Sequence, residues 1–216
     1  RLHSGQVYGL VWSLVERSDG RKFSKSTGEA VWLDAGLTSP YAFYQWFFNV
    51  PDEDAAAFLR VFTFLSLEEI AALEHEQGRD PSARPAQRAL AEGVTRIVHG
   101  EEGLQAALRA SRALFGDEPF AGLDDRTLAD AFEGAPSVDL PRGQLEAGIT
   151  VADLMVAAGA VRSRGEARRL VEQGGVSVNN RRAVDAGVLL GPGDLAGSAT
   201  IVLRLGKKRH FLTRFT

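Results

Sequence analysis

The sequence contains no cysteine among its 216 residues. Disulfides, thiolate zinc sites and a cysteine nucleophile are therefore excluded, and a chain without cysteine fits a reducing cytoplasm. Histidine is also scarce. The four histidines stand singly, and no two share the i,i+4 spacing of a helical metal site, so no protein-bound metal is expected.

Long apolar runs are absent as well. No stretch approaches the ~18 uncharged apolar residues that a membrane-spanning helix requires. The first residues are not a signal peptide, because no apolar core with a small-residue cleavage site is present. We therefore expect no membrane contact and a cytoplasmic location. The sequence also begins without methionine, which indicates that it starts inside a longer gene product or was trimmed.

Acidic residues are sparse at one end of the chain. Residues 149–216 carry 11 Lys+Arg against 5 Asp+Glu, whereas residues 1–148 carry 14 against 23. A basic module attached to an acidic body indicates nucleic acid as a partner. The charge alone does not settle this, because a positive field attracts any anion and names none.

Composition divides the chain into three regions and a linker. Residues 1–34 contain the apolar run 7–15, which predicts a buried strand, but they are too few to bury a core. They must be the end of a larger domain. Residues 137–148 are rich in proline, glycine and polar residues without periodicity, which predicts a linker.

Residues 35–136 are predicted to form an all-helical domain. Ser39 and Pro40 give a helix start, as N-cap and first helical residue, and Ser66 with Glu69 forms a capping box. The aromatic stripe within 41–48 is expected in the core rather than stacked on bases. Further helices are predicted over 53–62, 67–76, 82–98, 101–114 and 125–132.

Residues 149–216 are predicted to form two short helices followed by strands. Thr150 caps the first helix, over 151–158, and Ser163 begins the second, with Glu166 completing a capping box. Asn179 and Asn180 form a turn that tolerates positive φ. The predicted strands cover 176–178, 183–184, 200–205 and 210–215.

A cationic loop occupies residues 19–28. Lys22 and Lys25 stand three apart, with Ser24 and Ser26 beside them. Lysine ammonium groups suit polyphosphate, and a closing cationic loop stabilises the charge that builds during adenylate formation. Serine hydroxyls can donate to phosphate oxygens. The alternative is a solvated surface loop, since short motifs discriminate loosely.

Three elements of the basic end each present candidate RNA-binding residues. Arginine is suited to phosphate because its fork donates two parallel hydrogen bonds. The alternative is that Arg168 only pairs with Glu172 and that the lysines only confer solubility. The candidates are Arg164, Arg168 and Arg169 on the second helix, Asn179, Arg181 and Arg182 at the turn, and Lys207, Lys208 and Arg209 at the hairpin tip.

Residues 22–26, Lys-Phe-Ser-Lys-Ser, resemble the lysine–serine signature of class I aminoacyl-tRNA synthetases. Phe23 replaces the commoner methionine, as it often does in bacterial tyrosyl-tRNA synthetases. The order of further segments resembles the same family over essentially the whole chain. These segments are 28–34, 38–45, 86–92 and 98–102, and then 163–171 with 174–179, which resemble the S4 RNA-binding fold.

The resemblance implies ATP-dependent attachment of tyrosine to tRNA(Tyr) through tyrosyl-adenylate, with Mg²⁺ accompanying ATP. Lys25 would contact ATP together with Ser24 and Ser26, and Lys22 would assist at the pyrophosphate. We expect a homodimer formed through a half that is not in this sequence. These 216 residues alone are expected to be inactive.

The implied fold is multi-domain α+β. Residues 1–34 would end a Rossmann-like α/β catalytic domain, 35–136 would form a helical domain that binds the anticodon arm, and 149–216 would form a small S4-like domain. That last domain would hold the tRNA near its long variable arm. A non-catalytic S4-type RNA-binding protein is the alternative function. A paralogue specific for tryptophan is a further alternative, which the S4-like tail disfavours.

The helical region offers few candidates for RNA contact. It is acidic, so any tRNA contact there must use local patches such as Arg84, Arg88 and Arg96. His99 is expected to serve a helix end or a hydrogen bond in the core rather than catalysis.

Overall fold

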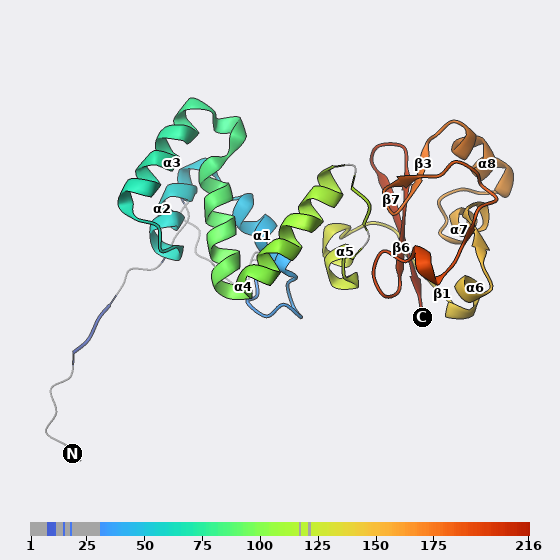
Figure 1. The fold of residues 1–216 in the computed structure, drawn as a ribbon, viewed down its shortest axis with the longest axis horizontal. Helices are drawn as coiled ribbons and strands as arrows, with labels where there is room; N and C mark the ends of the chain where they lie inside the picture. The colour runs from blue at the N-terminus through green and yellow to red at the C-terminus, as the bar shows by residue number, and fades with distance from the viewer. Residues whose placement is uncertain (1–7, 12–14, 16–17, 19–30, 117, 121) are drawn as a thin grey trace, which may run out of the picture.

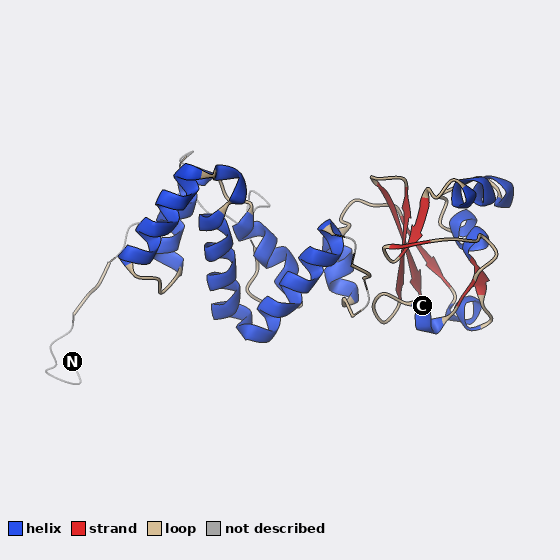
Figure 2. Cartoon of the chain, turned by 45° about the horizontal axis from the view of Figure 1, so that its top comes forward, coloured by secondary structure: helices blue, strands red, loops and turns tan. Residues whose placement is uncertain are grey.

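A computed structural model of the chain describes residues 8–11, 15, 18, 31–116, 118–120 and 122–216. The molecule is elongated, with helices at one end and a β-sheet flanked by short helices at the other (Figure 1). Figure 2 shows the same separation of helices from strands. The protein is a mixed helical and sheet structure, as the sequence predicts.

The helical part packs around one long bent helix. α1 contacts α4 most extensively, and α2 and α3 also pack against α4. The helices are α1 (Pro40–Phe48), α2 (Asp52–Phe62), α3 (Leu67–Arg79), the 3-10 turn η2 (Pro81–Ala83), α4 (Pro85–Phe115) and α5 (Asp125–Ala131).

Local capping signals set the helix boundaries. The Ser39 side chain accepts from the Ala42 amide and Pro40 begins α1, while Ser66 and Glu69 form the complete capping box of α3. Gly100 has the non-helical angles φ 70° and ψ −179° inside α4, so the two helices predicted over 82–98 and 101–114 meet at a kink, and the predicted boundary at this glycine is confirmed. The bend is visible in Figure 1.

The aromatic residues of α1 belong to the core. Tyr41, Phe43, Tyr44 and Phe47 are all buried. Phe43 is completely buried and its ring lies 5.1 Å from that of Phe47, centroid to centroid. The prediction that these side chains pack inside the protein is therefore confirmed.

The sheet part contains two sheets. The larger has the strand order β1-β7-β6-β3-β4, in which β1 runs parallel to β7 and the other pairs are antiparallel. β2 and β5 form a separate antiparallel pair. The elements are β1 (Ser137–Leu140), α6 (Arg142–Glu146), β2 (Ile149–Thr150), α7 (Val151–Ala157), α8 (Arg164–Glu172), β3 (Val176–Val178), β4 (Arg181–Arg182), β5 (Leu189–Leu190), η3 (Pro192–Asp194), β6 (Thr200–Leu205) and β7 (Arg209–Phe215).

The larger sheet is covered on both faces. Because side chains alternate along a strand, Ile201 and Leu203 of β6 join a core with α7 and α8. Val202 and Leu212 point the other way and pack with α5 and the end of α4. We call the face that carries Ile201 and Leu203 the outer face of the sheet, and the face that carries Val202 and Leu212 the inner face. The inner face therefore joins the sheet to the helical part.

The segment 137–148 is folded, so the prediction of a linker is wrong. Ser137 of β1 lies opposite Leu212 of β7, the Arg142 amide donates to the Thr216 carbonyl at 2.9 Å, and Leu145 of α6 is completely buried. Four residues without a local pattern become a strand because their partner lies at the far end of the chain. Local sequence patterns do not contain that information.

The prediction of a buried strand over 7–15 is wrong for the residues that can be compared. Residues 8–11 form no strand, and the side chains of Tyr8, Leu10 and Val11 are 85%, 94% and 92% exposed. A strand needs hydrogen-bonded neighbours, and none of the described strands pairs with these residues. Val15 packs against the helical core.

The start of α8 and the strands after it differ in detail from prediction. The Ser163 hydroxyl accepts from the Glu166 amide at 3.2 Å, but the Glu166 carboxylate accepts from the Arg162 amide rather than completing the box at Ser163. Asn179 and Asn180 have φ of 46° and 64°, as predicted. The second strand begins directly after this two-residue turn, at 181–182 instead of 183–184, because a tight turn pairs its flanking residues.

Candidate functional site

The lysine loop lies outside the described residues. Lys22, Ser24, Lys25 and Ser26 all fall within 19–30. The roles predicted for them in ATP binding therefore stay predictions. The segment that follows the loop, residues 31–39, is described.

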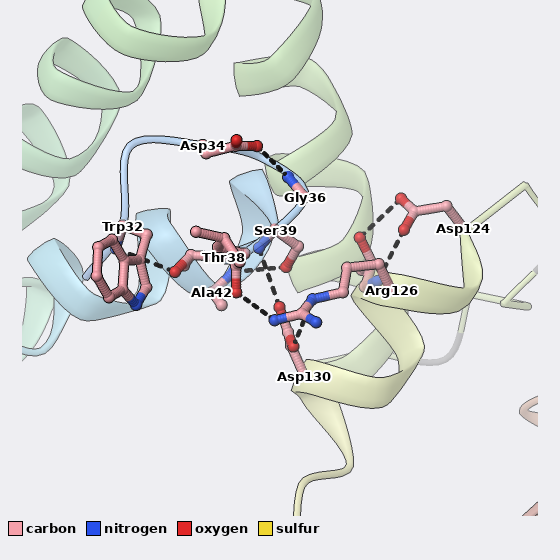
Figure 3. A network of polar contacts seen from close by, with 11 residues as sticks. Trp32, Asp34, Gly36, Thr38, Ser39, Ala42, Asp124, Arg126 and Asp130 are labelled. Atoms are coloured by element: carbon pink, nitrogen blue, oxygen red, sulfur yellow. Dashed lines mark hydrogen bonds and ion pairs between the residues drawn. The ribbon is translucent and has the colours of Figure 1, made fainter. Parts of the chain in front are cut away.

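Hydrogen bonds within this segment close it into a compact turn (Figure 3). The Leu37 and Thr38 amides both donate to the Asp34 carbonyl at 3.0 Å, and the Asp34 carboxylate accepts from the Gly36 amide at 2.7 Å. The Trp32 amide donates to the Thr38 hydroxyl at 3.1 Å. The turn therefore has a defined shape where the chain leaves the lysine loop.

Two side chains of α5 hold the turn in place. The Arg126 guanidinium donates to the Leu37 carbonyl, and the Asp130 carboxylate accepts from the Ser39 amide at 3.0 Å. Arg126 and Asp130 also form an ion pair at 3.1 Å, and Figure 3 shows both side chains pointing toward the turn. α5 thus fixes the segment that follows the lysine loop.

The same short helix binds the basic tail through Asp125. Its carboxylate accepts from the Ser198 amide at 2.9 Å, from the Ser198 hydroxyl at 2.5 Å and from the Ala199 amide at 3.3 Å. Partial burial raises the pKa of Asp125, but hydrogen bonds from Ser198, Thr200 and Ala199 outweigh it and hold this pKa below its ordinary value. One helix of seven residues therefore contacts both the flank of the lysine loop and the tail.

Asn179, predicted to bind RNA, uses its side chain inside the protein. Its Oδ1 accepts from the Val202 amide at 2.8 Å, and its Nδ2 donates to the Asp194 carbonyl at 2.5 Å. The side-chain amide therefore connects β6 to η3. This geometry supports a structural role for Asn179 rather than the predicted contact with RNA.

Asn180 connects the tail to the helical part. Its Nδ2 lies 3.1, 3.1 and 2.8 Å from the carbonyl oxygens of Ala113, Gly116 and Glu118. The last carbonyls of a helix have no partner within the helix, so Asn180 satisfies acceptors at the end of α4. The asparagine at this turn therefore has a function that glycine could not supply.

The predicted cations of α8 have different surroundings. Arg164 forms an ion pair with Asp153 of α7, and the hydroxyl of Thr150 and then Arg164 hold the pKa of Asp153 below its ordinary value. Arg168 and Arg169 are exposed. No ion pair joins Arg168 to Glu172 within the described ranges, so the pairing considered as the alternative is absent.

β4 and the hairpin tip approach the end of α8. The guanidinium of Arg182 lies against Gly174, and the Gly206 amide donates to the Gly175 carbonyl at 2.8 Å. Gly174 and Gly175 directly follow α8, so β4 and the tip converge there. Lys207, Lys208 and Arg209 are exposed at the tip, and Arg181 is exposed beside a hollow of about 210 Å³.

Sequence reasoning missed two residues of the inner face, Arg204 and His210. They lie opposite each other on β6 and β7, and the His210 ring packs on Phe132 with 4.8 Å between ring centroids. Burial and then Arg204 lower the pKa of His210, against a hydrogen bond to the Lys208 backbone. The alternation of the hairpin strands was the available signal, since it places Arg204 on the same face as Val202.

The arginines considered in the helical part are mostly engaged. Arg84 lies over the Phe48 ring at 4.9 Å and Arg96 pairs with Glu101 at 2.7 Å, whereas Arg88 is exposed. His99 lies at the helix end before Gly100, with its ring edge on Phe43. Its buried Nε2 has no hydrogen-bond partner among the residues that the structure describes, and burial lowers its pKa.

The described residues include no group of three or more His, Cys, Asp or Glu side chains that could hold a metal ion. No helix in the described ranges combines the length and the apolarity needed to cross a membrane.

Comparison with known proteins places the chain in a family. Residues 1–116 match the family described as tRNA synthetases class I (W and Y). The chain belongs to this family. Residues 127–213 match a second family, described as the tyrosine–tRNA ligase SYY-like C-terminal domain.

The similar proteins are named tyrosine–tRNA ligase or tyrosyl-tRNA synthetase. The tyrosine–tRNA ligase of Roseiflexus castenholzii is 46% identical over 99% of this chain and 51% of its own length. The tyrosine–tRNA ligase of Parabacteroides distasonis is 42% identical over 98% of this chain and 50% of its own length. A C-terminally truncated mitochondrial tyrosyl-tRNA synthetase from Aspergillus nidulans shares 41% identity over 40% of this chain and 25% of its own, with a TM-score of 0.39. The chain spans about half the length of the relatives it matches.

Proposed function

We propose that the protein containing this chain is a tyrosine–tRNA ligase, which activates tyrosine with ATP to tyrosyl-adenylate and transfers it to tRNA(Tyr). One observation carries the proposal: the match over residues 127–213 is to a domain of tyrosine–tRNA ligases. The match over 1–116 covers both tryptophan and tyrosine enzymes. The match of the tail therefore favours a tyrosine enzyme over a tryptophan enzyme.

Each region of the chain is proposed to have its own role, in sequence order. Residues 1–34 end the class I catalytic domain, 35–136 form the helical domain that binds the anticodon arm, and the tail binds the same tRNA. The S4-like domain is proposed to begin at β1 rather than at 149, because β1 pairs with β7 of the tail. The complete protein is proposed to be a cytoplasmic homodimer that uses ATP with Mg²⁺ as substrate.

Lys22 and Lys25 are proposed to supply cations to ATP, Lys25 at the nucleotide and Lys22 at the departing pyrophosphate, with the hydroxyls of Ser24 and Ser26 donating to phosphate oxygens. Their support is the signature at residues 22–26, which stands a few residues before the described turn in the sequence. Cations that act on charge developing in the transition state raise the rate of activation more than substrate affinity.

The test is Lys25→Ala in the complete gene product. Tyrosine-dependent exchange of pyrophosphate into ATP is expected to fall by a factor of about 100 or more, as for the loss of a group that stabilises transition-state charge. Affinity for tRNA(Tyr) should stay within about twofold, because the tail is unchanged. Exchange at the normal rate would contradict the proposed role, and exchange by the 216 residues alone would refute the expectation that they are inactive.

A further inference from the structure

Four side chains form a row across the inner face of the larger sheet. Arg182 of β4 lies opposite Ser177 of β3, Ser177 lies opposite Arg204 of β6, and Arg204 lies opposite His210 of β7. Directly opposed residues of neighbouring strands project to the same face. We call Arg182, Ser177, Arg204 and His210 the basic strip.

The strip begins where α5 stops covering the sheet. Val202 and Leu212, two residues away on β6 and β7, are buried beneath α5 and the end of α4. Arg204 and His210 are only half-buried, and Phe132, which directly follows α5, packs on His210. The strip therefore lines the margin of the contact between the helical part and the sheet, and it leads to the cations at the hairpin tip.

Within the described part of the chain, no carboxylate pairs with the cations of the strip. No ion pair to Arg182 or Arg204 occurs among the residues that the structure describes. The hydrogen-bond partner of Arg204 is neutral, since its Nη2 donates to the Ser177 hydroxyl at 3.3 Å. Burial and then Arg204 lower the pKa of His210, which favours the uncharged ring, so Arg204 is the central charge of the row. An external anion would compensate this charge.

A second arginine on the same face provides a contrast. Arg214 of β7 shares the inner face with His210 and lies at the opposite end of the strand. It is placed opposite Asp139 of β1 and Thr200 of β6. A carboxylate thus lies across from Arg214, while a hydroxyl and an imidazole lie across from Arg204. Arg214 forms no ion pair among the described residues either, so the two arginines differ in the residues that face them and not in ion pairing.

We propose that the basic strip binds the phosphate backbone of RNA at the margin between α5 and the sheet, with Arg204 as its central contact. The inference rests on the proposed function and makes it more specific, because it places the RNA on the inner face. The cations of α8 lie on the outer side. A row that continues into Lys207, Lys208 and Arg209 fits an extended polyanion better than a single small anion, and arginine forks suit phosphate oxygens.

The experiment measures binding of the 216-residue chain to a tRNA(Tyr) transcript over a range of salt concentrations. Arg204→Gln is expected to weaken binding about tenfold and to reduce the slope of log K against log [salt] by roughly 0.7–0.9, the loss of one phosphate contact. Arg204→Lys should keep the slope, because the charge remains. The matched control Arg214→Gln should change neither quantity.

Two further measurements separate the strip from general effects. Ser177→Ala removes the hydrogen bond to Arg204 but no charge, and it should leave the salt slope unchanged. If it lowers the slope as much as Arg204→Gln, the effect is structural and the proposal is overturned. Equal losses for Arg204→Gln and Arg214→Gln would also overturn it, since a general positive field would explain both.

The proposed function and the strip fail in different ways. If the unaltered chain does not bind tRNA, the RNA-binding part of the proposed function fails and the strip fails with it. If the unaltered chain binds tRNA(Tyr) and Arg204→Gln binds with the same salt slope, the strip alone is wrong.

Discussion

Asn180 shows how much one side chain in a two-residue turn contributes to the structure. It adopts φ of 64°, a conformation that costs an ordinary L-residue roughly 1–2 kcal/mol. Its amide lies within hydrogen-bonding distance of one carbonyl in the last turn of α4 and of two carbonyls just after that helix. The turn conformation and the contact with α4 can be tested separately, because glycine keeps the first and loses the second.

We expect Asn180→Gly to lower the free energy of unfolding by about 1 kcal/mol, the loss of hydrogen bonds to α4. Asn180→Ala should cost roughly 1–2 kcal/mol more, because alanine also resists positive φ. Urea denaturation followed by circular dichroism measures both. If the two variants are equally stable, the backbone conformation of the turn contributes nothing.

The residues predicted correctly were those whose signal is local. Ser39, Ser66, Thr150 and Ser163 all cap the helices that the sequence assigned to them, because a cap depends on residues three positions away. Asn179 was predicted to bind RNA from its position in the turn. Its actual partners, on β6 and η3, are distant in sequence and could not be inferred.

At the scale of elements, the seven-residue helix α5 contacts both parts of the molecule. It reaches the turn at 34–39 through Arg126 and Asp130 and the tail through Asp125. The helix itself was predicted from its pattern. Its contacts were not, because they join segments that are far apart in the chain, as does the pairing of β1 with β7 that refuted the linker.

The Asp125 contacts predict a pH dependence of stability. The folded-state pKa lies below the ordinary value, so the contribution is fully present above about pH 4 and is lost as the pH falls through the folded pKa. We expect Asp125→Asn to cost about 1 kcal/mol at pH 7, because the site is partly exposed. The cost should be smaller at pH 3.

Urea midpoints of the unaltered chain and of Asp125→Asn, at both pH values, measure this difference. Asp139→Asn is a suitable control, since Asp139 is exposed on β1 and its removal should matter little at either pH. A cost for Asp125→Asn that is the same at pH 7 and pH 3 would show that the carboxylate charge is not what stabilises the contact.

The whole molecule is expected to unfold as one unit. A single core combines Tyr41 of α1 and Ala110 of α4 with Leu128 of α5, Val202 of β6 and Leu212 of β7. Shared burial of this kind couples the two parts, whereas a flexible linker would let them unfold separately.

Leu212→Ala tests this coupling, because it is a truncation in the tail that should cost roughly 2–5 kcal/mol. All three tryptophans precede residue 149, so tryptophan fluorescence reports on the region before the tail. The fluorescence midpoint should fall together with the midpoint of the circular dichroism signal. A fluorescence midpoint that does not move would show that the helical part unfolds independently.

The contacts of α5 also decide where two relatives can be recombined. Toward the helical part, Arg126 and Asp130 bind the Leu37 carbonyl and the Ser39 amide, which are main-chain groups that a homologue with the same turn supplies whatever its side chains. Toward the tail, Asp125 also uses the Ser198 hydroxyl, which depends on sequence. A chimera should therefore inherit α5 together with its own tail. We therefore expect a chimera to fold best when the junction between the two relatives lies between the end of α4 and Asp124. A junction within 137–148 would instead combine Asp125 of one relative with the Ser198 loop of the other.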